Sequence, residues 1–176
     1  MTENALVSVL RTLSRKRRLQ FFMNSIVIDV QSISESEALG RRLAADLFPG
    51  AVVALVGTLG AGKTLLVRAI AQGLDIPNPA IVNSPTFILI QEYGARLPIY
   101  HFDAYRLASE AEFGELGVHE YFQGNGVCLV EWADKVQSCL PRERLEIRIS
   151  ITGEQSRRFE ILAIGKRYES IAAGLR

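Results

Sequence analysis

The chain has 176 residues, of which 48% are hydrophobic and 22% are charged, a composition typical of one globular domain and not of a disordered chain or a coiled coil. Its twenty basic and nineteen acidic residues leave a formal net charge of +1, so bulk charge does not indicate nucleic-acid binding. The longest aliphatic run, Ala51 to Val56, has six residues, whereas a membrane-spanning helix needs roughly 20.

The basic residues are unevenly distributed along the chain. Residues 1–22 hold five Lys or Arg side chains and one acidic side chain, and the rest of the chain holds fifteen basic and eighteen acidic residues. We predict a basic, poorly ordered arm over residues 1–24, one domain over residues 25–165 and a C-terminal tail over residues 166–176. The arm also resembles a transit peptide faintly and could contact RNA, and Met23 is an alternative start that a measurement of N-terminal mass would decide.

Helical and strand patterns alternate along the rest of the chain. In chain order they predict a helix over residues 34–47, a strand over 51–56, a glycine-rich turn over 57–64, a helix over 64–73 and a loop over 75–85. They then predict strands over 86–93 and 97–102, a helix over 109–116, a strand over 127–130, a helix over 133–139, and strands over 145–151 and 158–164. Ser34 and Glu37 have the spacing of a capping box at the start of the first helix.

The order of these elements predicts the fold class. A buried strand, a glycine-rich loop and a helix in succession are typical of the start of a P-loop unit. The last two strands, and the pair around residues 94–96, are close enough in sequence to form antiparallel hairpins. We therefore predict an α/β fold, a three-layer P-loop NTPase fold with a mostly parallel central sheet and antiparallel hairpin strands at its margins.

Residues 57–64 form the most informative motif. They read Gly-Thr-Leu-Gly-Ala-Gly-Lys-Thr and fit the pattern G-x-x-x-x-G-K-[ST]. Glycines let backbone N–H groups approach phosphate oxygens, Lys63 adds a charge for the β- and γ-phosphates, and the Thr64 hydroxyl is an oxygen ligand for Mg²⁺. No Asn-Lys-x-Asp segment for reading guanine occurs, so we expect ATP. The motif residues predicted to hold it are Gly57, Thr58, Leu59, Gly60, Ala61, Gly62, Lys63 and Thr64.

Two carboxylates that follow apolar strands are candidates for holding magnesium and orienting water. Asp103 follows Ile-Tyr-His-Phe, and Glu131 follows Val-Cys-Leu-Val. The carboxyl ends of strands face the ligand crevice in open α/β sheets, so both side chains could point at the phosphates; a helix cap or a surface ion pair is the alternative for each. Thr86 is a candidate hydroxyl for sensing the γ-phosphate, or it simply begins a strand after Pro85.

Other polar side chains carry weaker signals. We expect His101 to pack or hydrogen-bond beside Asp103, because two histidines far apart in sequence do not make a metal site. Arg106 could reach a phosphate or nucleic acid, or pair with Glu110 four residues on. Trp132 either stacks beside the site or packs in the core. We expect exposed strand charges at Arg157 and Arg158.

The motifs occur together in a defined order. They are the P-loop at 57–64, Ser-Pro-Thr-Phe at 84–87, Tyr-His-Phe-Asp-Ala-Tyr-Arg-Leu at 100–107, Glu-Leu-Gly at 115–117 and Leu-Val-Glu-Trp at 129–132. Over about residues 27–164 this constellation resembles the TsaE family (also called YjeE), the bacterial ATPases of tRNA threonylcarbamoyladenosine synthesis. A P-loop alone is common to many families, whereas its combination with S-P-T-F, H-x-D-x-Y-R and E-W is specific.

The resemblance implies a small P-loop protein that binds ATP with Mg²⁺ and acts with TsaB and TsaD. Those partners install a threonylcarbamoyl group on the adenosine beside the anticodon of ANN-decoding tRNAs. ATP hydrolysis by this subunit would support repeated turnover without forming the carbamoyl bond, and tRNA would be reached through the complex. The free thiols Cys128 and Cys139 fit a reducing compartment, and we expect a cytoplasmic protein without membrane contact.

The resemblance also implies residue roles. The implied catalytic residues are Glu131, Lys63 and Thr86, with Glu131 orienting the attacking water, and the implied magnesium ligands are Thr64, Asp103 and Glu131. Trp132, next to the catalytic acid, and Leu65 complete the nucleotide-binding set. The chain departs from the family at Thr58, where an acidic residue is frequent, and at Leu65, where a Thr or Ser is frequent, so no acid or extra hydroxyl acts at these positions.

Two other classes of function share the phosphate-binding motif. One is a small kinase that phosphorylates a nucleoside or another small molecule, but the sequence has no evident lid insertion between Glu131 and Pro141. The other is a nucleotide-dependent interaction module without catalysis. We expect slow hydrolysis by the isolated chain, because no motif fixes an arginine finger.

Overall fold

The computed structural model describes residues 25–175, so the predicted basic arm and the alternative start at Met23 lie outside the described residues. Within that range, seven strands form one sheet in the order β1-β7-β6-β2-β5-β4-β3. The strands are β1 (Ser25–Val30), β2 (Val52–Val56), β3 (Ile90–Tyr93), β4 (Ile99–Asp103), β5 (Val127–Glu131), β6 (Arg144–Ile151) and β7 (Arg157–Ile164). The helices are α3 (Ile33–Ala45), α4 (Lys63–Gly73), α5 (Glu110–Glu115), α6 (Val118–Phe122) and α7 (Lys166–Gly174), with the 3-10 turns η1 (Pro79–Ile81), η2 (Ala133–Lys135) and η3 (Gln137–Cys139).

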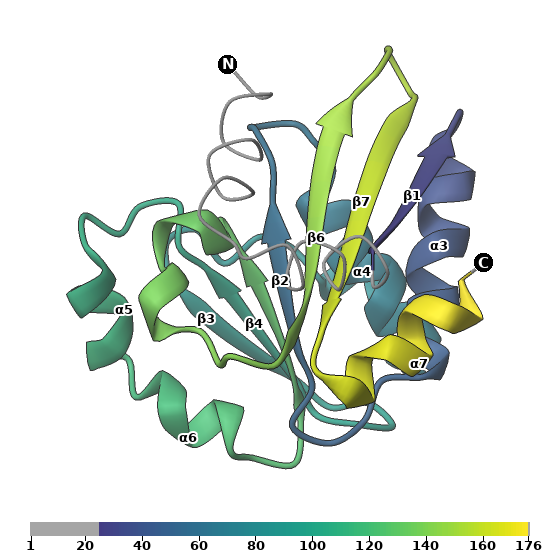
Figure 1. The fold of residues 1–176 in the computed structure, drawn as a ribbon. Coiled ribbons are helices and arrows are strands. Elements are labelled where there is room, and N and C mark those ends of the chain that lie inside the picture. The colour runs from purple at the N-terminus through teal and green to yellow at the C-terminus, as the bar shows by residue number, and fades with distance from the viewer. Residues whose placement is uncertain (1–24, 176) are drawn as a thin grey trace, which may run out of the picture.

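The centre of the sheet is parallel and its margins are antiparallel. Strand β2 pairs in parallel with both β5 and β6, and β4 pairs in parallel with β5. Strand β3 lies antiparallel to β4 at one margin, and β7 and β1 follow β6 as antiparallel strands at the other. The predicted fold class and both predicted hairpins are confirmed. Parallel pairing also brings the carboxyl ends of β2, β4 and β5 to the same edge of the sheet (Figure 1).

Apolar side chains on the two faces of the sheet form two separate clusters. The larger cluster joins α3, α4 and α7 to one face, and the smaller one joins α5, α6 and η2 to the other face (Figure 1). The middle layer is therefore buried on both sides, as expected for continuous apolar strands.

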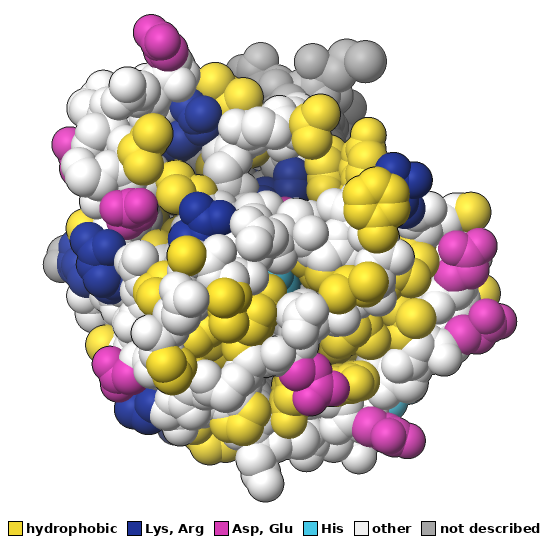
Figure 2. Space-filling view, turned by 180° about the vertical axis from the view of Figure 1, so that it is seen from behind, with side chains coloured by type: hydrophobic (Ala, Val, Ile, Leu, Met, Phe, Trp, Pro, Cys, Tyr) yellow, Lys and Arg dark blue, Asp and Glu magenta, His cyan; other side chains and the backbone are white. Residues whose placement is uncertain are grey.

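On the surface seen from behind, hydrophobic side chains form patches between charged side chains of both signs (Figure 2). That face of the described chain therefore shows no continuous basic stripe. Within residues 25–175, no helix combines the length and the apolar character needed to cross a membrane.

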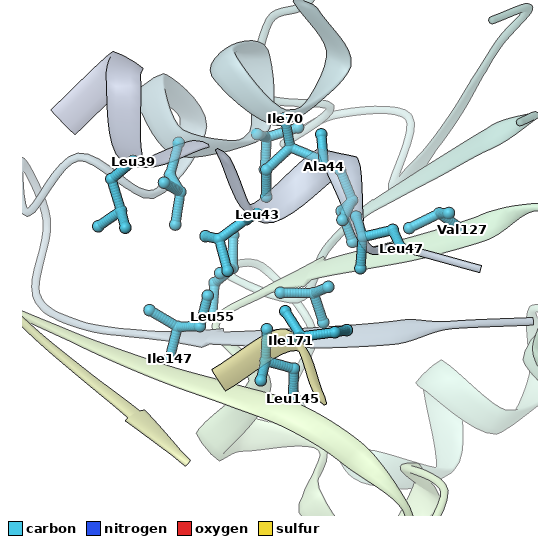
Figure 3. Close-up of a cluster of buried hydrophobic side chains, with 14 of the residues drawn as sticks. Leu39, Leu43, Ala44, Leu47, Leu55, Ile70, Val127, Leu145, Ile147 and Ile171 are labelled. Carbon is cyan, nitrogen blue, oxygen red and sulfur yellow. The ribbon is translucent and has the colours of Figure 1, made fainter. Parts of the chain in front are cut away.

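In the larger cluster, Leu43 of α3 and Ile70 of α4 point toward the sheet, where Leu55 and Ile147 lie beneath them (Figure 3). All four side chains have a relative exposure of 1% or less. Burying a side chain of this size stabilises the fold by about 1.5–3 kcal/mol. This packing fixes α4 on the sheet, and with it the loop that leads into the helix.

Helix α3 uses a different capping residue from the predicted one. The Ser32 hydroxyl accepts a hydrogen bond from the Glu35 N–H at 3.2 Å, and the Glu35 carboxylate accepts one from the Gln31 N–H at 2.9 Å. Ser32 and Glu35 have the same spacing as Ser34 and Glu37. The spacing alone therefore could not show which of the two serines caps the helix. The prediction of Ser34 as the cap is wrong by two residues.

Residues 133–139 form two 3-10 turns and not the predicted helix. Val136 separates η2 from η3 with φ −131° and ψ 29°, outside the helical region, and its side chain is fully buried. The branched Val136 side chain packs into the smaller cluster, and this burial takes precedence over the local helical pattern.

The predicted strand over residues 86–93 begins later than expected. The N–H groups of Ile88 and Leu89 both donate to Pro85 O, at 3.1 and 2.7 Å, so this segment turns before β3 begins at Ile90. The pattern also did not predict β1 or α6, which are short elements.

The predicted C-terminal tail over residues 166–176 is wrong for its described part. Residues 166–174 form α7, whose Tyr168 and Ile171 are buried in the larger cluster. The Tyr168 hydroxyl oxygen accepts a hydrogen bond from the Val52 N–H at 2.9 Å. Helix α7 is therefore part of the domain and covers the start of β2.

Helices α3 and α4 cross so closely that Gly40 has no room for a side chain. A Cβ at Gly40 would collide with Ala69 Cβ and lie 3.2 Å from the Ala69 carbonyl carbon. We expect Gly40→Ala to lower the free energy of unfolding by about 1–3 kcal/mol, because overpacking forces the helices apart. Urea denaturation measures this change.

Gly114→Ala is the matched control, since Gly114 lies in helix α5 and a Cβ there would meet no atom within 4 Å. Alanine is favoured over glycine in helices by about 0.5–1 kcal/mol, so this variant should be unchanged or more stable. Equal effects of the two substitutions would contradict the close crossing of α3 and α4.

Candidate functional site

Residues 57–62 connect β2 to α4 through a loop with left-handed backbone. Gly60 has φ 75° and Gly62 has φ 106°, a region that favours glycine. A Cβ at either position would meet no atom within 4 Å. Glycine is therefore favoured here because of the backbone conformation and not because of crowding. Gly62 is the N-cap of α4 and provides no side-chain cap. The N–H groups of the first helical turn are thus placed to bind an anion.

The start of α4 borders a cavity of about 470 Å³, a volume within the range of small-molecule sites. The lining comes from the P-loop, the segment before β3, and the ends of β4 and β5. The lining residues are Leu59, Gly60, Gly62, Lys63, Thr64, Leu65, Ser84, Thr86, Asp103, Tyr105, Glu131 and Trp132. The cavity therefore brings together every side chain that was predicted as catalytic or as a magnesium ligand.

Lys63 lies in the cavity wall, and its ammonium group is held by the loop itself. Lys63 Nζ donates to Gly57 O at 2.7 Å and to Thr58 O at 2.9 Å, and it lies 3.6 Å from the centre of the Trp132 ring. Burial lowers the pKa of the Lys63 ammonium, and the nearby carboxylates, Glu131 first, act in the opposite direction. The predicted residues Gly57 and Thr58 therefore act through carbonyl groups that position Lys63, and they do not line the cavity.

Glu131 lies at the end of β5 and is 2% exposed. Its two carboxylate oxygens accept from Thr64 Oγ1 at 2.8 and 3.0 Å. His101 Nε2 lies 2.8 Å from Glu131 Oε1, and His101 is fully buried. The imidazole thus contacts Glu131, and not Asp103 as we expected. It reaches across from β4 to the neighbouring strand.

Asp103 ends β4 and holds the loop that carries Thr86. Its Oδ2 accepts hydrogen bonds from Thr86 Oγ1 at 2.8 Å and from Ser84 Oγ, and its Oδ1 accepts one from the Tyr105 N–H at 2.8 Å. Asp103 is 2% exposed. Ser84 and Tyr105 were not predicted as site residues, although Ser84 lies in the S-P-T-F segment and Tyr105 in the H-x-D-x-Y-R segment.

The two carboxylates are adjacent, because Asp103 and Glu131 are register partners on parallel strands. With the Thr64 hydroxyl they offer the hard oxygen ligands that Mg²⁺ prefers. Among residues 25–175, no group of three or more His, Cys, Asp or Glu side chains is placed to hold a metal alone. The donor set fits a magnesium ion bound by one or two carboxylates together with phosphate oxygens and water.

Trp132 borders the cavity next to Glu131, with a left-handed backbone (φ 58°). The Trp132 and Tyr105 ring centroids are 4.9 Å apart and tilted by 40°. Of the two alternatives for Trp132, the structure favours a place beside the site. Within the loop, Ala61 is fully buried and does not line the cavity, whereas Leu59 lines it and is 74% exposed.

The structure confirms the expected exposure of one arginine side chain, Arg158, and corrects part of what was expected for Arg106 and Arg157. Arg106 does not pair with Glu110; its guanidinium lies 4.3 Å from the centre of the Phe87 ring. Arg158 is an exposed strand charge, as expected, and pairs with Asp29 at 2.8 Å. Arg157 is only partly exposed. Its guanidinium contacts the P-loop, because Arg157 Nε donates to Ala61 O at 2.9 Å.

Comparisons with known proteins agree with this arrangement. The sequence model of the family described as "Threonylcarbamoyl adenosine biosynthesis protein TsaE" matches residues 30–159. A tRNA threonylcarbamoyladenosine biosynthesis protein TsaE from Bacillus subtilis is 47% identical over 142 residues, which are 80% of this chain and 87% of that protein. The TsaE protein of Treponema pallidum is 41% identical over 112 residues, 64% of this chain and 82% of the relative.

A solved structure supports the same relationship. The crystal structure of Bacillus subtilis YdiB superposes with a TM-score of 0.74 at 40% sequence identity, and the match covers 86% of this chain and 93% of YdiB. Sequence and fold therefore agree over the same region, which includes the P-loop and both strand-end carboxylates. The chain belongs to the TsaE family of threonylcarbamoyladenosine biosynthesis proteins.

Proposed function

We propose that this chain is the Mg²⁺-dependent ATP-binding and ATP-hydrolysing subunit of the assembly that forms threonylcarbamoyladenosine in tRNA, acting with TsaB and TsaD. One observation carries the proposal: the glycine loop, Lys63 and the start of α4 converge on a cavity that also contains Thr64, Asp103 and Glu131. An anion-binding helix start beside hard oxygen ligands suits a magnesium nucleotide.

Each part of the site has a task in phosphoryl chemistry. The N–H groups of the loop and of the first turn of α4 bind phosphate oxygens, and Lys63 adds a positive charge that its hydrogen bonds to Gly57 O and Thr58 O hold in place. Bound magnesium would neutralise charge that develops on the phosphate oxygens. Thr64, Asp103 and Glu131 are the residues that would hold it.

We assign Glu131 the additional role of orienting the attacking water. Its carboxylate is buried, and hydrogen bonds from Thr64, together with the contact to His101, fix its orientation. A carboxylate held in this way can accept a proton or a hydrogen bond without first losing side-chain freedom. Thr86 is linked to the same region through Asp103, so the segment from Ser84 to Thr86 can respond to a γ-phosphate as a switch does.

The rim of the cavity supports the proposal that partner proteins complete the site. Leu59 lines the cavity and is 74% exposed, and Phe87 and Ile88, which follow the cavity residue Thr86 in sequence, are 82% and 62% exposed. Large apolar side chains exposed near a site are typical of interaction surfaces. After residue 22, the chain has more acidic than basic residues. The face in Figure 2 also intersperses both signs, so we propose that tRNA is reached through the complex and not bound tightly by this chain alone.

Depletion of the protein in cells tests this function. We expect tRNA threonylcarbamoyladenosine to fall, the chain to co-purify with TsaB and TsaD, and ATP hydrolysis by the purified chain to be slow until those partners are added. Rapid steady ATP turnover by the chain alone would contradict the dependence on partners. Unchanged tRNA modification on depletion would contradict the proposed role.

A further inference from the structure

Arg157, the first residue of β7, reaches across the edge of the sheet to the phosphate-binding loop. Its Nε donates to Ala61 O at 2.9 Å, and one terminal nitrogen lies 3.3 Å from Gly60 O. The other terminal nitrogen donates to Gly153 O at 3.0 Å and to Ser156 O at 2.8 Å. One guanidinium therefore joins the loop after β2 to the turn between β6 and β7, at the edge where both lie (Figure 1).

Within the described part of the chain, no carboxylate pairs with Arg157. The ion pairs found within residues 25–175 do not include Arg157, and its hydrogen-bond acceptors are main-chain carbonyl groups. The adjacent Arg158, in contrast, pairs with Asp29. The Arg157 guanidinium thus lies beside the loop without an ion-pair partner among the described residues, and its five N–H donors in a rigid planar group suit several carbonyl groups at once.

The position of the Ala61 carbonyl determines where the next N–H points. In a planar trans peptide the C=O and the following N–H point in opposite directions. Because Ala61 O accepts from Arg157 Nε, the N–H of Gly62 is directed away from the guanidinium. Gly62 lines the cavity together with Lys63 and Thr64. The contact at Gly60 O supports the adjoining turn, in which the Ala61 N–H donates to Thr58 O at 3.2 Å.

We propose that Arg157 is a positioning residue for the nucleotide phosphates: it holds the Gly60–Ala61 backbone so that the N–H of Gly62 faces the phosphate site. The inference rests on the proposed binding of a nucleotide by the P-loop. It also gives the turn between β6 and β7 a role in the site, although Ala61 and Arg157 are 96 residues apart in sequence.

We expect Arg157→Ala to weaken the binding of ATP and of inorganic triphosphate by about 10-fold or more, as expected when a hydrogen bond to a charged group that shapes the loop is lost. Both ligands should lose affinity by a similar factor, because the affected groups contact phosphate and not the base. Arg157→Lys keeps the charge but loses the planar donor geometry, so its affinity should lie between those of the wild type and the alanine variant.

The experiment measures the affinity of the full chain for both ligands by calorimetry, with thermal unfolding of every variant as a check on folding. Arg158→Ala is the matched control, since it removes the neighbouring guanidinium and its exposed ion pair without touching the loop; its affinity should stay within about twofold of the wild type, because such pairs contribute little. If Arg157→Ala does not fold, the test is made with Arg157→Lys, for which a loss of about threefold or more supports the proposal.

Three outcomes would overturn the proposal. Equal affinities of the Arg157 and Arg158 variants, with normal binding by the wild type, would reject the role of Arg157 and leave the proposed function intact. Loss of ATP affinity without loss of triphosphate affinity would place the effect at the base and not at the loop. A wild-type chain that binds neither ligand would reject the proposed function together with this inference.

Discussion

Replacing Glu131 by glutamine is expected to lower the rate of ATP hydrolysis by about 10²–10⁴-fold, the usual contribution of a positioned general base. The substitution preserves the size of the side chain and an oxygen that can accept from the Thr64 hydroxyl, which now lies 2.8 Å from Glu131 Oε1. It removes the negative charge and the proton-accepting ability of the carboxylate. ATP should still bind, because Lys63, Thr64 and Asp103 remain in the cavity, while hydrolysis is lost.

The measurement is single-turnover hydrolysis in the presence of the partner proteins, with ATP affinity determined separately. Glu120→Gln is a suitable control, because Glu120 is an exposed carboxylate in α6 and lies outside the cavity lining. Unchanged hydrolysis by the Glu131 variant would reject the assigned role. A panel of nucleosides included in the assay distinguishes a kinase, which would yield a phosphorylated nucleoside in place of free phosphate.

Replacing Lys63 by alanine is expected to weaken MgATP binding by roughly 10–100-fold, because hydrogen bonds to charged groups contribute about 1.5–3 kcal/mol. The variant also leaves Gly57 O and Thr58 O without the ammonium group that now bridges them, which loosens the loop. The chain has one tryptophan, and Trp132 lines the cavity, so its fluorescence should report nucleotide binding directly.

The exposed Lys166 provides the control for the loss of one positive charge. Lys166→Ala should bind MgATP like the wild type, since it begins α7 and lies outside the cavity lining. Full MgATP affinity in the Lys63 variant would be incompatible with a phosphate site at this loop. A matching loss of affinity in the Lys166 variant would indicate a nonspecific effect of charge.

The local parts of the site were predictable from the sequence, because their causes are local. The P-loop motif itself contains the glycines at positions 60 and 62, which adopt left-handed backbone, and it places a glycine without a side-chain cap at the start of the helix. The parallel sheet then carries Asp103 and Glu131 to one edge, which follows from each of them ending an apolar strand. The sequence could therefore place the phosphate loop and both carboxylates at one site.

The remaining features depend on contacts between distant segments. The pattern gave no reason to connect Arg157 with Ala61 or His101 with Glu131, since only the folded sheet brings these pairs together. The helix predicted over residues 133–139 failed because the buried Val136 takes a non-helical backbone to reach the core. Local propensity is a weak guide where tertiary burial opposes it.

If the loop before α4 and the first turn of that helix bind a polyphosphate, the amide resonances of the full chain should respond to titration with inorganic triphosphate. We expect saturable shifts concentrated at Gly60, Gly62, Lys63 and Thr64, the loop and helix-start residues that line the cavity. Amides of these residues that stay unmoved at saturating triphosphate would contradict it.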